Sequence, residues 1–274
     1  MIKVIDTDKL FDDYISDYVY KNIGKVKPEE IENQMPVLYE KFGDEPLKEL
    51  DGKTPNAYYS SFTAKELISC LKSHVEGGVP TSDFLLMAIL KADGAEVEIV
   101  KELLIDSEEE FTLYLMNILS DLNSDKAYSR YMEFILSDYP ESIKELATES
   151  LAQNPDLVKK SIVENFDGAD ALTKARFSEI LSGASRDDKV FEILINQFLN
   201  NPKEIPIYAG YLAKYGDERA LAFLETATLN EKLSYADFEE LRFAIEALGG
   251  EVKVSRDFTK DKTFRKITEK PKMN

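Results

Sequence analysis

An internal repeat of about 30 residues constrains the fold of this sequence more than any other feature. Four stretches align on a polar turn that follows an apolar helical run: ILSDLNSDKAYSRYMEFI, SLAQNPDLVKKSIVENF, ILSGASRDDKVFEILINQF and YLAKYGDERALAFLETA. Each run ends near a leucine, and an acidic residue follows five to seven positions later. The leucines are Leu119, Leu151, Leu181 and Leu212, and the acids are Asp125, Asp156, Asp188 and Glu218, spaced 31, 32 and 30 residues apart.

Apolar residues recur at fixed offsets after each acid. They stand six residues on (Tyr131, Ile162, Leu194, Leu224), seven on (Met132, Val163, Ile195, with Glu225 as the exception) and ten on (Ile135, Phe166, Phe198, with the weaker Thr228). ILKADGAEVEIVKELL is a degenerate earlier copy, and LRFAIEALGG is the first helix of a final one. A helix pair of this length cannot bury both apolar faces alone, so we expect the copies to stack and share one core. The acid at each turn is expected to cap the second helix, which explains it without catalysis.

Helical periodicity also covers the N-terminal 80 residues. Leu10, Phe11, Tyr14, Ile15, Tyr18 and Val19 lie on one face of a predicted helix over 9–23. A second helix is predicted over 27–43, with Pro28 at its first turn. A third is predicted over 62–78, where Thr63 and Glu66 have the spacing of a capping box. Only EVKVSRDF, residues 251–258, alternates like an extended segment, or like the start of a loose tail.

The last copy resembles a HEAT-type repeat, in which Gly-Asp-x-Arg-Ala-Leu recurs at the turn. Those positions are Gly216, Asp217, Arg219, Ala220 and Leu221. The resemblance covers residues 81–250 and implies an all-α, right-handed solenoid of about five helix pairs that holds partners. Residues 1–80 are then an N-terminal helical cap, and 251–274 a basic tail. LDGKTPNAYY is similar to a segment of uncharacterised bacterial HEAT-like proteins, a likeness that implies no function.

Charge divides the chain unevenly. The net charge is −18, whereas residues 251–274 hold eight Lys and Arg against four acids, a charge of +4, which leaves −22 for residues 1–250. So acidic a body repels nucleic acids and anionic membranes and favours basic partners. An acidic mimic of nucleic acid, which blocks a DNA-binding protein, is an alternative interpretation.

The sequence predicts a cytoplasmic location. No apolar run is long enough to span a membrane, and acids interrupt the N-terminus where a signal peptide would be apolar. The single cysteine, Cys70, excludes an internal disulfide.

Two motifs fall short of ligand sites. Gly52, Lys53 and Thr54 match the end of a phosphate-binding loop, but Leu47 replaces its first glycine, so we expect a turn and Thr54 as a helix N-cap before Pro55. The stretch that begins at Asp121 starts like a calcium loop with Asp121, Asn123 and Asp125. It then has Lys126 in place of glycine and Met132 in place of the last glutamate. No metal or cofactor is predicted.

Catalysis has few candidate groups. His74, the only histidine, follows Cys70 by four residues, so the pair could act as nucleophile and base or as two metal ligands. The neighbours Leu67, Ile68 and Leu71 favour a core position instead. Paired carboxylates, as in DSEEEF and YADFEEL, could hydrolyse glycosides but are typical of solvated helix faces.

Tyrosines cluster at three places in the chain, where they predict either helix packing or interface anchors. The clusters are Tyr58 with Tyr59, Tyr128 with Tyr131, and Tyr208 with Tyr211 and Tyr215. In the basic tail, Phe258 and Phe264 are apolar anchors. The tail is expected to be disordered, to fold back on the acidic body, or to form a second contact site.

These observations predict a non-enzymatic scaffold that binds a protein or peptide, with a basic partner as its natural complement. The alternatives are an enzyme that uses carboxylates or Cys70 with His74, and the nucleic-acid mimic.

Overall fold

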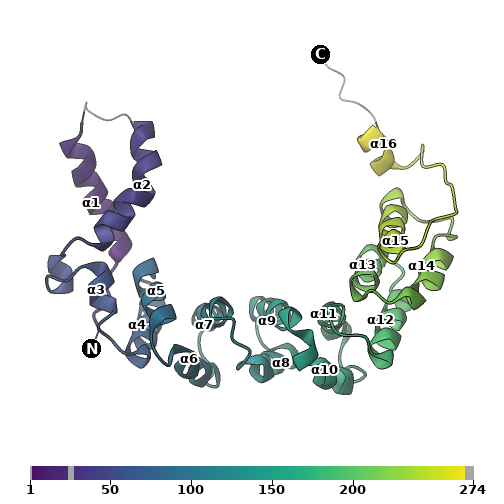
Figure 1. Ribbon diagram of the computed structural model, residues 1–274, viewed down its shortest axis with the longest axis horizontal. Helices are drawn as coiled ribbons and strands as arrows, with labels where there is room; N and C mark the ends of the chain where they lie inside the picture. Colours follow the sequence, from purple (N-terminus) through teal and green to yellow (C-terminus); the bar gives the residue numbers. More distant parts are fainter. Residues whose placement is uncertain (1, 24–27, 269–274) are drawn as a thin grey trace, which may run out of the picture. The chain divides into compact units, whose positions relative to one another are not determined.

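The protein is described here from a computed structural model, whose described residues are 2–23 and 28–268. Within these residues the chain is helical and contains no β-strand, which confirms the predicted all-α fold (Figure 1). Two compact units divide the chain, one of Met1–Arg130 with Pro140–Ile143 and one of Tyr131–Tyr139 with Lys144–Asn274. The division runs through α8 (Tyr128–Leu136) and α9 (Glu141–Gln153), and the predicted boundaries at residues 80 and 250 stay predictions.

The first unit contains seven complete α-helices and one short 3-10 helix within its described residues. They are α1 (Thr7–Lys21), α2 (Pro28–Gly43), η1 (Lys48–Leu50), α3 (Pro55–Tyr59), α4 (Ala64–Glu76), α5 (Asp83–Lys91), α6 (Ala95–Leu103) and α7 (Glu109–Asp121). Helix α4 packs against α5, α6 and α7, and so forms the centre of the unit, while α1 packs chiefly on α2.

Caps fix where these helices begin. Thr63 accepts a hydrogen bond from the Glu66 amide, and the Glu66 carboxylate accepts one from the Thr63 amide, which confirms the predicted capping box. Thr54 caps α3, with Pro55 at its first position, as predicted. Ser82, which is buried, caps α5 in the same way. Each cap satisfies backbone donors that a helix start leaves free.

The second unit continues after α9 with seven α-helices and two short 3-10 helices within its described residues. They are η2 (Pro155–Leu157), α10 (Lys159–Asn165), α11 (Ala171–Leu181), α12 (Asp188–Asn200), α13 (Ile205–Tyr215), η3 (Glu218–Ala220), α14 (Leu221–Ala227), α15 (Tyr235–Ala247) and α16 (Lys262–Thr268). Figure 1 shows α11, α13 and α15 in one row and α10, α12 and α14 in another. Helix α13 packs against α11, α12 and α15, so its packing partners are helices one or two places away in the chain.

The aligned repeat positions form the core of these helices. The four leucines at the ends of the apolar runs are at most 1 % exposed, as are the residues six positions after each acid. The positions ten residues on are also buried, including Thr228, which was the weakest match. These recurring positions are therefore core positions, as expected for repeats that share one core.

Polar links join turns that lie one repeat apart. In the first unit, the Lys126 ammonium donates to Glu96, 30 residues away. In the second unit, the Ser185 amide donates to the Asp156 carboxylate over 3.0 Å, 29 residues away. The Asp187 amide donates to the Tyr215 hydroxyl over 2.6 Å, 28 residues away. The period of these links matches the period of the sequence repeat.

The Gly-Asp-x-Arg turn ends one helix, caps the next turn and links two copies of the repeat. Gly216 ends α13 in the left-handed region, at φ +75°. Asp217 accepts from the Arg219 amide, so it caps the next turn. The Arg219 guanidinium binds Asp217 and also Asp188 of the preceding copy, at 2.8 Å, and lies 4.2 Å from the centre of the Phe191 ring. One arginine thus joins two copies by an ion pair and by a cation–π contact.

The predicted capping acids are off by one residue in two copies. Asp187 and Asp217 cap their helices, whereas the aligned acids Asp188 and Glu218 are the next residues. The Asp156 carboxylate instead accepts a hydrogen bond from the Ser185 amide of the following copy. The reason is that an N-cap directly precedes the first helical residue. The acids were aligned by their distance from the preceding leucine, which does not mark where the next helix begins.

The helices of the described residues, 2–23 and 28–268, are too short or too polar to cross a bilayer.

Replacing Gly216 by alanine should lower the free energy of unfolding by about 1 kcal/mol, because a β-carbon strains a left-handed residue. Gly210 is the matched control: it lies inside α13, and a β-carbon there would meet no atom within 4 Å. Gly210→Ala should stabilise by up to about 1 kcal/mol, because alanine is the better helix former. Urea denaturation measures both, and a shift in the same direction for the two variants would contradict the assignment of the turn.

The hydrogen bonds of the Asp156 carboxylate should make the stability of the fold depend on pH. Hydrogen bonds from Lys159 and then from Ser185 lower the pKa of the Asp156 carboxyl from 3.8 to about 2. A lowered native pKa stabilises the fold above the ordinary pKa, and this contribution is lost as the pH falls towards 2. The stability difference between the native protein and Asp156→Asn should therefore be constant above pH 5 and shrink towards pH 2. Thermal melts across this range test it, and an undiminished difference at pH 2 would rule out the link.

Candidate functional site

The C-terminal segment of the second unit holds the most distinctive surface. Residues 251–258 follow α15 without helix and alternate in exposure along the chain. Val252, Val254, Arg256 and Phe258 are half-buried, whereas Glu251, Lys253, Ser255 and Asp257 are exposed. The predicted extended character of EVKVSRDF is confirmed, because a period of two places alternate side chains on opposite faces.

Arg256 anchors this segment to the end of α14. Its guanidinium donates to the carbonyl oxygens of Thr228 and Asn230, each over 2.6 Å, and lies 5.6 Å from the centre of the Phe238 ring. A cation beside the last carbonyls of a helix also matches the negative end of the helix dipole. The described part of the tail, residues 251–268, therefore folds back on the second unit, one of the three predicted outcomes, and residues 269–274 lie outside the described residues.

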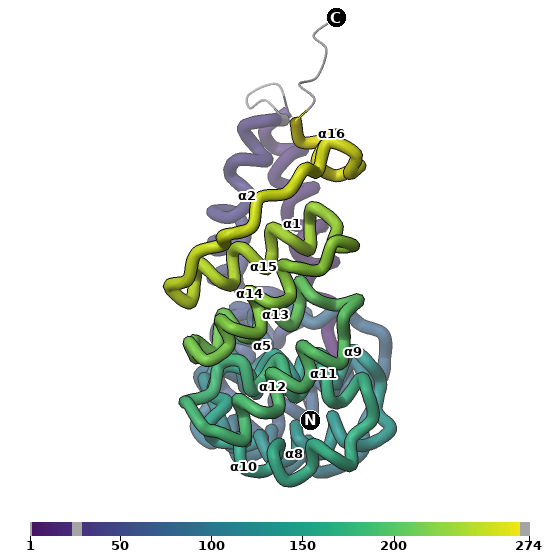
Figure 2. Tube along the Cα trace, turned by 90° about the vertical axis from the view of Figure 1, so that its right-hand side faces the viewer, coloured from purple at the N-terminus to yellow at the C-terminus, as the bar shows by residue number. Residues whose placement is uncertain are grey.

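Aromatic contacts secure the rest of the tail. The Phe258 ring centre lies 5.3 Å from that of Tyr235 and 5.2 Å from that of Phe238, and Phe264 of α16 lies 5.1 Å from Tyr235. Figures 1 and 2 both show the tail beside α15. Both predicted anchors, Phe258 and Phe264, contact aromatic rings of α15, and these contacts are apolar rather than ionic.

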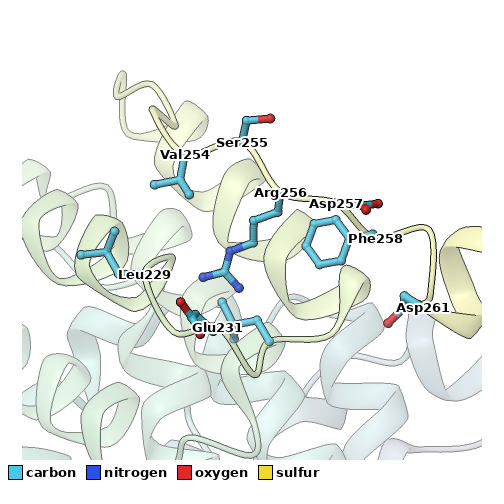
Figure 3. Close-up of a pocket in the computed structure, with 9 residues that line it drawn as sticks. Leu229, Glu231, Val254, Ser255, Arg256, Asp257, Phe258 and Asp261 are labelled. Carbon is cyan, nitrogen blue, oxygen red and sulfur yellow. The ribbon is translucent and has the colours of Figure 1, made fainter.

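Two cavities follow one side of the extended segment. The larger, about 580 Å³, lies between Val254–Phe258 and the turn that contains Leu229, Glu231 and Leu233 (Figure 3). The smaller, about 370 Å³, lies between Glu251–Val254 and α14. Leu229 and Val254 line both, so the cavities meet there. We call them together the C-terminal groove.

Carboxylates dominate the polar lining of the C-terminal groove. Two cationic side chains, Lys253 and Arg256, line the groove, against five carboxylates. The carboxylates are those of Glu225, Glu231, Glu251, Asp257 and Asp261. Figure 3 shows the Arg256 side chain extending from the segment into the larger cavity on the side of Glu231. The apolar lining includes Leu229, Ile245 and Val252. This surface suits a chain with apolar and cationic side chains.

Two of these carboxylates also hold the local backbone. Asp261 accepts from the amides of Phe264 and Tyr235, which lowers the pKa of its carboxyl. Asp257 accepts from the Thr259 amide, which likewise lowers the pKa of its carboxyl. Both are therefore ionised near neutral pH and contribute negative charge to the groove.

The backbone of the extended segment is free to bind. Among the described residues, the amides and carbonyls of 251–256 form no hydrogen bond within the chain. Extended backbone with free donors and acceptors can pair with another extended chain. The alternation of EVKVSRDF is the one sequence pattern that pointed to this site. No pattern pointed to Leu229 or Glu231, which lie in a turn elsewhere in the chain.

The Gly-Lys-Thr stretch is a turn, as predicted. Asp51 and Gly52 lie in the left-handed region, at φ 57° and 79°, and Lys53 donates to the Ser61 hydroxyl. The calcium-like stretch is also a turn: Lys126, where the loop would have glycine, binds Glu96.

Cys70 and His74 lie in the core of the first unit and do not form a dyad. The Cys70 thiol points to the Lys3 carbonyl, at 3.9 Å, and burial raises the pKa of this thiol to about 11. The His74 Nδ1 donates to the Pro80 carbonyl over 3.0 Å, which leaves Nε2 buried without a partner among the described residues. No group of three or more His, Cys, Asp or Glu side chains in the described residues could hold a metal ion.

Acids of the two candidate catalytic stretches serve the fold. Asp237 of YADFEEL hydrogen-bonds with Ser234 at the start of α15, and Glu239 pairs with Arg242 at 2.7 Å. In DSEEEF, Glu109 accepts from Ser142. These carboxylates cap helices and link turns.

The tyrosine clusters pack rather than project. Tyr58, Tyr59, Tyr128, Tyr131, Tyr208 and Tyr215 are buried. Tyr211 is half-buried, and burial, with Glu179 nearby, raises the pKa of its hydroxyl to about 12.

Comparisons with protein-family models, curated proteins and solved structures find no match for this chain. The site therefore has to be interpreted from its own geometry.

A protonated, buried thiol should be inert. At pH 7.5 the folded protein should react with iodoacetamide at Cys70 at least about a hundredfold more slowly than in urea, since the pKa shift alone removes that much thiolate. Mass spectrometry of alkylated peptides measures the rates. Equal rates in the folded and unfolded states would restore Cys70 as a candidate nucleophile.

Proposed function

We propose that this chain is a non-enzymatic interaction scaffold of the cytoplasm that binds an extended, basic segment of a protein partner in the C-terminal groove. The observation that carries the proposal is the free backbone of residues 251–256 along a groove lined by carboxylates. We further propose that the helix pairs form a right-handed, HEAT-like solenoid, whose repeated turns hold the groove in place.

Pairing of main chains would supply the affinity. A partner strand beside residues 251–256 would satisfy amides and carbonyls that otherwise bind only water, and its alternate side chains would enter the cavities. Leu229 and Val254, where the cavities meet, would contact an apolar side chain. Glu231 and Asp257 would face a lysine or an arginine, and such rim charges chiefly increase the association rate and confer salt dependence.

The other candidate functions have less support. In the first unit, Cys70 and His74 are buried and hydrogen-bond to different groups. Among the candidate carboxylates, Asp237 hydrogen-bonds at a helix start, Glu239 pairs with Arg242, and Glu109 accepts from Ser142. The acidic nucleic-acid mimic depends on net charge alone. A scaffold is favoured because, within the described residues, the C-terminal groove combines free backbone, cavity and charge.

A random peptide library displayed on phage and panned against the full chain tests the proposal. We expect the enriched peptides to be rich in Lys and Arg with alternating apolar residues. Lys253→Pro or Ser255→Pro should weaken their binding about tenfold or more, because proline removes an amide donor from the edge.

Lys253→Ala and Ser255→Ala are the matched controls, since both side chains are exposed and alanine keeps the amide. They should change the affinity less than about threefold. The proposal fails if no peptide is enriched, or if both proline variants bind the enriched peptides as tightly as the native chain does.

A further inference from the structure

The hairpin of α1 and α2 leaves its apolar face only half covered. Thr7 is the sole buried residue of α1, and the six residues of its apolar stripe are all half-buried: Leu10, Phe11, Tyr14, Ile15, Tyr18 and Val19. On α2, Leu38 and Phe42 are buried, whereas Ile31, Met35 and Tyr39 are half-buried. An amphipathic helix normally buries such a stripe against another element.

Aromatic contacts anchor one end of the hairpin. There, the ring centre of Phe11 lies 4.9 Å from that of Tyr39 and 5.3 Å from that of Phe42, and Tyr39 stacks on Phe84 of α5 at 4.9 Å. At the other end, Tyr20 is 78 % exposed. Clustered aromatic and aliphatic side chains left open to water mark an interaction surface.

The polar positions of both helices are acidic. Helix α1 carries Asp8, Asp12, Asp13 and Asp17 against two lysines, and α2 carries Glu29, Glu30, Glu32 and Glu40 against one lysine. Eight acids against three bases give the pair a charge of −5. Partial burial, with Asp6 and Asp83 nearby, raises the pKa of the Asp8 carboxyl, as expected where negative charges crowd.

The negative charge of the hairpin favours a basic helix over a second copy of the hairpin as the binding partner of this face. A second copy of the hairpin would place −5 against −5, which opposes association. A basic amphipathic helix would cover the apolar stripe and place its cations beside the acids. We propose that the α1–α2 face receives such a helix from a protein partner, of about 15 residues to match the length of α1.

This docking face is independent of the C-terminal groove, because it lies wholly in the first unit. The two surfaces differ in what they recognise: the groove takes an extended segment, and the hairpin takes a helix that presents residues at i, i+3, i+4 and i+7.

Synthetic peptides of 15 residues serve as probes. One has leucine at those helical positions and lysine elsewhere, and the second is a scrambled sequence of the same composition. Fluorescence anisotropy with the full chain should show that the amphipathic peptide binds at least tenfold more tightly than the scrambled one. Hydrogen exchange should show protection by this peptide in residues 7–21 and 28–43.

Charge reversal at Asp12→Lys with Asp13→Lys should weaken binding of the amphipathic peptide about tenfold, because both residues are exposed acids of α1. Glu145→Lys with Glu149→Lys, two exposed acids of α9, is the matched control and should leave the affinity unchanged. Equal loss in both variants, equal binding of the scrambled peptide, or protection outside the hairpin would overturn the proposal. So would sedimentation of the chain alone as a dimer with protected α1 and α2.

Discussion

The structure depends on one constraint: a helix pair of about 30 residues cannot bury its own apolar faces, so each pair needs its neighbours. The aligned leucines and the residues six and ten positions after each acid meet that constraint, and they are buried in every copy. Polar links at the turns then set the register between copies. Arg219 shows the principle most completely, because it binds Asp217 of its own turn, Asp188 of the preceding copy and the face of Phe191.

Much of this architecture could be predicted from the sequence, because the evidence for it is local or periodic. The Thr63–Glu66 capping box, the Thr54 cap and the alternation after Gly250 depend on residues close together in the chain. The capping acids were misplaced by one residue, since the leucine spacing varies while the cap must adjoin the helix. The handedness of the helix pairs stays a prediction that follows from the family resemblance.

The candidate site was harder to predict because it joins distant residues. Leu229 and Glu231 belong to the turn after α14. They line the same cavity as Val254 and Arg256 because the tail folds back beside this turn. The sequence showed an excess of positive charge in this tail and suggested attraction to the acidic body. The contacts are different: Arg256 binds helix-end carbonyls rather than a carboxylate of the body, and Phe258 packs on aromatic rings.

The charge of the body is therefore available for partners. Acids at the turns are used in caps and links, whereas those along the α1–α2 hairpin and beside the C-terminal groove remain at the surface. Both surfaces combine negative charge with exposed or half-buried apolar groups, and they differ in backbone geometry. In the proposed scaffold, one surface would bind a helix and the other an extended segment.

Removal of one whole copy tests the repeat account most directly. Deletion of residues 187–216 places the capping Asp217 where Asp187 stood, 30 residues earlier, and retains a turn equivalent to the one removed. If the copies are interchangeable units that contact only their neighbours, the shortened chain will unfold cooperatively in urea, with the same helical circular dichroism per residue. Loss of the cooperative transition, or a marked fall in helicity per residue, would contradict a stack of repeats.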